Sequence, residues 1–239
     1  MLEQYCTEIM KLESFQKENI LTETFRLYRR DNLEIYYSPH NEIINEKAKV
    51  LIIGITPGWT QTCIAYRTAR DGLRNRSGLE EIKKQCKRNS RFAGSMRKNL
   101  IEMLDELNLN KKLRLESCCE LFADRDDLLH TTSLIPYPVF VNQKNYTGSH
   151  PRIMENELLY GLLKKYFYPE ASCLSDTLMI PLGNCVGEIL QQMIREKAIQ
   201  EEQCLLGFPH PSGANGHRKR QFWENKERLQ KAIESFFAT

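Results

Sequence analysis

KVLIIGITPGW, residues 49–59, is a short apolar run that ends in glycine and proline. Such a run is typical of a parallel strand that is buried on both faces and leads into a functional loop. Three later runs share this character, namely Leu128–Ile135, Thr177–Leu182 and Cys204–Phe208. The sequence therefore predicts four buried strands.

Helical patterns lie between these runs, and they cover Phe92–Leu107, Pro151–Tyr168 and Gly183–Lys197, with Arg218–Phe237 closing the chain. Strands that alternate with helices imply right-handed crossovers and a parallel sheet covered on both faces. We expect an α/β fold, a three-layer α/β/α sandwich around a four-stranded parallel sheet. An amphipathic helix from Leu2 to about Arg29 is expected ahead of it.

Length and composition favour one domain. The chain has 239 residues and 41% apolar content, enough for one sizeable core. We expect a single domain over residues 1–239, with a helical extension over residues 1–48 and a core over residues 49–239. No run of about 18 apolar residues exists, and the first twenty residues are charged. The expectation is a soluble monomer in the cytoplasm or on the nucleoid, neither secreted nor bound to a membrane.

Charge is distributed unevenly along the chain. The net charge is only +3, but the segment Arg67–Lys98 holds eleven Lys or Arg residues against three acids, so it carries +8. A basic segment of this kind is expected of a protein that binds the phosphate backbone of DNA, because neutralising phosphates releases counterions. A solvated helix and loop is the alternative interpretation.

The eight cysteines form no Cys-x-x-Cys pair, which argues against a zinc ribbon. We expect mostly reduced, buried thiols. An iron–sulfur cluster is geometrically possible, but the spacing does not favour one. No metal and no organic cofactor is expected.

Two loops carry residues suited to chemistry. Residues 54–59, GITPGW, follow the first predicted strand, and residues 207–218, GFPHPSGANGHR, follow the last. Proline makes each loop rigid, and glycine lets another backbone approach closely. In a parallel sheet the ligand crevice lies beyond the carboxyl ends of the strands, so both loops are expected to border it.

With these loops, the chain resembles the uracil-DNA glycosylase superfamily. Three further stretches fall in that family's order: Phe92-Ala93-Gly94 with Asn99–Leu104, then His130–Pro136, then Met179–Asn184. The resemblance covers about residues 49 to 237. It implies a four-stranded parallel sheet between helices and an enzyme that excises a base from DNA, with DNA as its partner.

The resemblance also implies a mechanism. His210 would donate a hydrogen bond to the departing base, Thr56 would orient the attacking water, and Phe92 would stack on the extruded base. No lysine falls at a motif position in the two loops, so we expect a monofunctional enzyme without lyase activity. A hydroxyl at Thr56 is a poor general base, so stabilisation of the leaving base would carry most of the rate enhancement.

The resemblance further implies a set of contacts. Residues expected to bind the substrate base are Gly54, Ile55, Pro57, Gly58, Phe92, Thr131 and Thr132. Residues expected to bind DNA are Ser95, Arg97, Lys98, Pro211, Ser212, Gly213, Ala214, Asn215, His217 and Arg218. Thr131 stands where the family has a uracil-reading Asn, and its shorter side chain leaves space. The expected substrate is therefore uracil or a modified pyrimidine, including bulky bases of the kind found in phage DNA, whose excision would act in defence.

Two other functions stay open at this stage. One is a catalytically silent nucleic-acid-binding module of the same fold, in which Thr56 no longer supports turnover. The other is a hydrolase of free nucleotides, which would show no salt-dependent binding to DNA.

Overall fold

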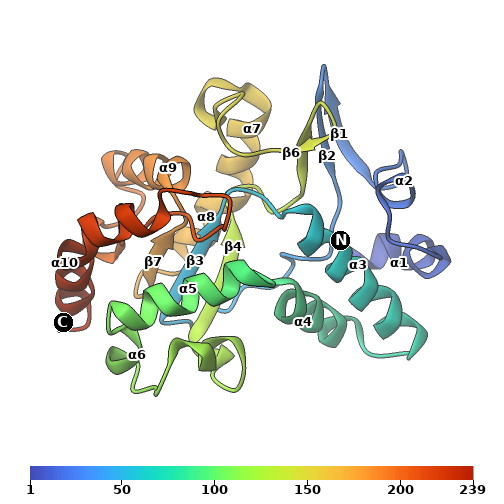
Figure 1. Ribbon diagram of the computed structural model, residues 1–239. Coiled ribbons are helices and arrows are strands. Elements are labelled where there is room, and N and C mark those ends of the chain that lie inside the picture. The colour runs from blue at the N-terminus through green and yellow to red at the C-terminus, as the bar shows by residue number, and fades with distance from the viewer. Residues whose placement is uncertain (239) are drawn as a thin grey trace. The chain divides into compact units, whose positions relative to one another are not determined.

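The computed structural model describes residues 1–238, and the chain divides into two compact units. The first unit consists of Met1–Ile44, Thr56–Ala93 and Ile135–Leu163. The second consists of Asn45–Ile55, Gly94–Leu134 and the chain from Lys164 onward. Each unit is described separately, with the element labels of Figure 1. No helix within residues 1–238 combines the length and the apolar character that crossing a bilayer requires.

The second unit contains a parallel sheet of three strands in the order β4-β3-β7. The strands are β3 (Val50–Gly54), β4 (Leu129–Ser133) and β7 (Leu178–Pro181). All residues of β4 and β7 are buried, and only Gly54 at the end of β3 is partly exposed. The α/β class and three of the predicted strands are confirmed.

The fourth predicted strand is wrong as stated. Residues 204–208 align with β7 only through one parallel bridge between Met179 and Cys204, where Leu205 N donates to Met179 O (2.8 Å). Gly207 then takes a left-handed φ of +81° and Pro209 lacks an N–H, so the extended ladder cannot continue. The predicted apolar run is present, but its hydrogen-bonded pairing with β7 ends after one residue.

Helices accompany this sheet. They are α5 (Ser95–Glu106), α6 (Leu109–Lys112), η1 (Cys118–Phe122), η2 (Asp126–Leu128), η4 (Leu163–Phe167, which begins at the last residue of the first unit), α8 (Tyr168–Ser172), α9 (Asn184–Arg195), η5 (Glu201–Gln203) and α10 (Arg218–Phe236). In Figure 1, α5 crosses in front of the strands. Helix α10 contacts α5, where Lys226 Nζ donates to Glu106 Oε1 (2.6 Å). The predicted helices at α5, α9 and α10 are confirmed. The helix predicted over residues 151–168 is broken into shorter pieces.

The first unit contains a second sheet that the sequence analysis did not predict. It is antiparallel, in the order β1-β2-β5-β6, with β1 (Arg26–Arg30), β2 (Leu33–Tyr36), β5 (Val139–Val141) and β6 (Lys144–Asn145). Its helices are α1 (Leu2–Lys11), α2 (Lys17–Ile20), α3 (Trp59–Arg74), α4 (Leu79–Ser90), η3 (Ile153–Glu155) and α7 (Glu157–Leu162). The helix predicted from Leu2 to about Arg29 therefore ends at Lys11. The backbone of Leu12 is extended, and β1 begins at Arg26.

Several cations of the basic segment Arg67–Lys98 hold α1 in place. Arg70 donates to Leu12 O (3.1 Å), Arg74 donates to Met10 O (3.4 Å), and Lys83 pairs with Glu3 (2.9 Å). Hydrogen bonds to Glu80 and to Glu3 raise the pKa of Lys83 above its usual value, and the hydrogen bond from Lys83 lowers the pKa of Glu3 to about 2. Part of the charge excess therefore serves the fold of the first unit.

Candidate functional site

His210 lies at the carboxyl edge of the parallel sheet. Leu182 N donates to Ile53 O (2.9 Å), and Gly183 N donates to Phe208 O (3.1 Å). These backbone hydrogen bonds connect the end of β7 to the end of β3 and to the loop that carries His210. Gly183 has a φ of +86°, and a Cβ built there would lie 3.1 Å from His210 Cβ. A glycine is thus required where the start of α9 meets this histidine.

The hydrogen bonds of His210 define its tautomer. Ser212 N donates to His210 Nδ1 (3.2 Å), so Nδ1 is an acceptor and the proton of a neutral ring sits on Nε2. Burial lowers the pKa of this half-buried imidazole below 6.5. At neutral pH the ring is uncharged and offers an Nε2–H donor.

The loop after His210 is held by its own side chains. Asn215 Nδ2 donates to His210 O (3.2 Å), and Arg218 Nη1 donates to Ser212 O (2.8 Å). Ser212 Oγ accepts from Ala214 N (3.2 Å). The predicted DNA contacts Asn215 and Arg218 therefore also shape the loop. Gly213, Ala214, Gly216 and His217 form its exposed tip.

The second turn of α5 supports this loop through a residue to which the sequence analysis gave no role. Asn99 Nδ2 donates to Pro211 O (2.9 Å). Nothing in the local sequence indicates this contact, because it joins residues 112 positions apart in the chain. It fixes the carbonyl directly after His210.

The other predicted residues of α5 differ in their surroundings. Ser95 and Lys98 are exposed, and Lys98 lies 3.9 Å from Glu102. Arg97 lies over the Phe122 ring at 5.4 Å, and burial lowers its pKa. Arg97 is thus packed against the protein, whereas Ser95 and Lys98 are accessible to a ligand.

Thr131 and Thr132 are buried in β4, and within residues 1–238 neither hydroxyl has a hydrogen-bond partner. Their neighbour His130 bonds Glu170 of α8 through Nε2 (2.6 Å), so His130 points to the face that α8 covers. Side chains alternate along a strand, so Thr132 shares that face and Thr131 points to the opposite one. An unsatisfied buried hydroxyl is costly, and a ligand that bonded it would remove the cost.

The residues predicted around the first loop belong to both units. Gly54 pairs with Ser133 at the sheet edge, its carbonyl accepts from Leu134 N (3.0 Å), and Ile55 follows it in the second unit. Thr56, Pro57, Gly58 and Phe92 belong to the first unit. Gly58 begins α3, where Gln61 Oε1 accepts from Gly58 N (2.9 Å).

Phe92 has an unusual backbone. Its φ is +42°, a region that bulky residues rarely adopt, and its side chain is buried. Such outliers gather at functional sites, where surrounding structure holds the strain.

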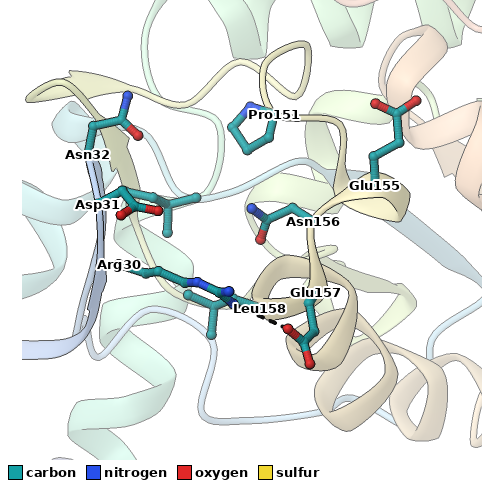
Figure 2. A pocket seen from close by; sticks show the side chains of 9 residues that line it. Arg30, Asp31, Asn32, Pro151, Glu155, Asn156, Glu157 and Leu158 are labelled. Atoms are coloured by element: carbon teal, nitrogen blue, oxygen red, sulfur yellow. Dashed lines mark hydrogen bonds and ion pairs between the residues drawn. The ribbon is translucent and has the colours of Figure 1, made fainter.

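Two cavities lie elsewhere in the molecule. One in the first unit has about 300 Å³, and Figure 2 shows it between the β1–β2 turn and the start of α7, where Arg30 pairs with Glu157 (3.3 Å). One in the second unit has about 810 Å³ and lies at the opposite end of the sheet from His210, next to Lys49 and Leu128, which precede β3 and β4. Neither is lined by the predicted site residues. Among residues 1–238, His, Cys, Asp and Glu side chains do not gather in threes suited to a metal ion.

Comparison with known proteins gives one informative result. No protein-family model matches the chain, and no solved structure matches it. The uncharacterized protein YoxB of Bacillus subtilis (strain 168) is 45% identical over 226 residues, which cover 94% of this chain and 88% of YoxB. That identity extends through both units, and the chain therefore belongs to the family of YoxB.

Proposed function

We propose that this protein is a monofunctional DNA glycosylase, which hydrolyses the N-glycosidic bond of a flipped-out pyrimidine and leaves an abasic site. The proposal includes a uracil-DNA glycosylase-like fold, in which residues 204–208 take the place of the fourth strand. The observation that carries it is the position of His210, a half-buried imidazole at the carboxyl edge of a parallel sheet whose Nδ1 accepts a hydrogen bond from Ser212 N.

In the proposed reaction, the bond between the base nitrogen and C1′ breaks and its electron pair leaves with the base. His210 Nε2–H donates a hydrogen bond to the base carbonyl that gains negative charge, which lowers the barrier. A water molecule adds to C1′, and the proton that it releases passes to the departing base anion. The products are a free base and an abasic sugar.

Other side chains have supporting roles in this proposal. Thr131 offers the base edge a hydroxyl that has no partner in residues 1–238. The short Thr131 side chain favours a pyrimidine larger than uracil. Ser95, Lys98 and the exposed tip of the His210 loop contact the phosphate backbone.

A test is incubation with oligonucleotides that contain uracil, hypoxanthine, mismatched thymine or modified cytosines, followed by alkaline cleavage. We expect strand breaks with at least one pyrimidine. His210→Asn should reduce the rate about 100- to 1,000-fold, the typical effect of removing one preorganised donor, with unchanged affinity for DNA. His150→Asn is the matched control, because His150 is exposed in the first unit.

Thr56 favours a second candidate function, a silent DNA-binding module, because a hydroxyl cannot act as a general base at neutral pH. This candidate predicts DNA binding by the wild-type protein without strand breaks at any of the tested bases.

A further inference from the structure

We infer that the exposed face of α10 formed by Lys219, Arg220 and Trp223, here called the Trp223 face, binds an unpaired DNA strand by stacking one base on the indole ring. The inference rests on the proposed function, since it takes DNA as the substrate, and it adds a preference for single-stranded or locally unpaired DNA.

Trp223 is unusually accessible. Its exposed fraction is 59%, the largest among the exposed large hydrophobic residues, the others ranging from 39% to 44%. Tryptophan normally buries most of its surface, because the large ring gains more from leaving water than other side chains do. A ring held in solvent is therefore a candidate for contact with a partner.

The ring is also positioned from one side. Lys226 Nζ lies 4.4 Å from the Trp223 ring centroid, and the same ammonium donates to Glu106 Oε1 of α5 (2.6 Å). Because Lys226 is anchored to a second helix, its cation–π contact restrains the indole. Less rotamer freedom is then lost when a base stacks on the ring.

The charges around Trp223 favour a nucleic acid over a protein. Lys219 and Arg220 are exposed one helical turn before Trp223, and Arg220 Nε lies 3.6 Å from Glu224 Oε1. Glu227 is exposed one turn after the ring. The exposed residues of α10 on either side of the ring are charged. A protein partner would favour a continuous apolar patch there instead. A planar ring beside cations matches a base and its phosphates.

The order of these charges gives the strand a direction. Arg220 and Glu224 form an ion pair and largely offset each other. Phosphates are attracted to Lys219 and repelled by Glu227, so a strand stacked on Trp223 extends toward the start of α10. Arg218 at that start donates to Ser212 O in the His210 loop (2.8 Å). The bound strand therefore runs from Trp223 to the loop that carries His210.

Base pairing decides which DNA can use this face. In a duplex both faces of each base are covered by neighbouring bases, whereas an unpaired base has a free π-face. The Trp223 face therefore selects unpaired DNA over duplex DNA of equal length.

Fluorescence provides the test, because Trp59 and Trp223 are the two tryptophans of the chain. In a Trp59→Phe background, oligothymidylate should quench the fluorescence of Trp223 and an equally long duplex should quench it less. Trp223→Ala should weaken binding of oligothymidylate about tenfold, measured by anisotropy of a labelled strand, with little change for the duplex. Lys231→Ala, an exposed α10 cation two turns farther along, is the control and should change neither.

Equal quenching by both DNA forms, or unchanged affinity in Trp223→Ala, would overturn the inference. If the wild-type protein cleaves a test base and Trp223→Ala binds oligothymidylate with unchanged affinity, the inference about Trp223 is refuted and the proposed function is not. Binding of oligothymidylate that depends on Trp223, without cleavage at any base, supports the inference and refutes the glycosylase proposal.

Discussion

His210 links its protonation state to the shape of its loop. Protonation of Nδ1 would place a proton against Ser212 N–H, which now donates to that atom. Because burial lowers the pKa of His210, the neutral ring persists below pH 6.5. We predict that kcat/KM for base release falls in acidic buffer with a midpoint below pH 6.5. An acid limb with its midpoint above pH 6.5 would contradict this account.

His40 gives a prediction about stability in the first unit. It is buried against Ser90, and burial followed by repulsion from Lys87 lowers its pKa to about 3. Between pH 6.5 and about 3, the unfolded chain binds a proton at His40 and the folded chain does not. The free energy of unfolding should therefore decrease as the pH falls through this window, by up to about 1.4 kcal/mol per pH unit.

The check is urea unfolding at pH 5.0 and 6.5, followed by Trp59 fluorescence in a Trp223→Phe background. His40→Asn should lower stability at pH 6.5 and flatten the dependence on pH. A His40→Asn protein that loses as much stability between the two pH values as the parent would show that another group titrates.

At the scale of elements, the junction of β7 and α9 positions the candidate site. Gly183 has φ +86° and ψ 175°, a region open almost only to glycine. Gly183→Ala should destabilise the protein by about 1–3 kcal/mol and, because the new Cβ meets His210 Cβ, slow base release at least tenfold. Thermal unfolding and single-turnover cleavage measure the two effects.

Gly187→Ala is the matched control in the same helix. Gly187 lies inside α9, and a Cβ there meets nothing within 4 Å. This change should stabilise the protein by about 0.5–1 kcal/mol and leave cleavage unchanged. Equal cleavage rates in the two variants would mean that the Gly183 contact does not position His210.

Elements with a strong local signal were predictable from the sequence. The continuous apolar runs gave β3, β4 and β7, and helical periodicity gave α9 and α10. The antiparallel sheet was missed because its strands are two to five residues long and partly polar. Helices α3 and α4 were missed because charged residues dominate their exposed surfaces.

The candidate site was predictable to a similar degree. Pro and Gly around His210 marked a loop beyond a buried apolar run, and the structure places His210 at the sheet edge. The contact of Asn99 with Pro211 and the return of Arg218 to Ser212 are tertiary, so no local pattern carries them. The opposite directions of Thr131 and Thr132 follow from strand alternation once β4 is known.

At the scale of the whole molecule, part of the charge excess stabilises the first unit. In the first unit, Arg70, Arg74 and Lys83 are occupied by α1 and its C-terminal end. In the second unit, Ser95 and Lys98 and the start of α10 present accessible groups near the His210 loop.

The region aligned with YoxB covers 88% of that protein, so the proposed activity can be tested on both chains. In the proposed reaction a base leaves DNA while the sugar–phosphate backbone stays intact.

Mass spectrometry of the products before alkali treatment measures this directly. With DNA carrying the pyrimidine that gives strand breaks in alkali, we predict an equimolar free base and an unbroken abasic strand, both lost in His210→Asn. A broken backbone without free base, or DNA recovered unchanged at every base tested, would contradict the glycosylase account.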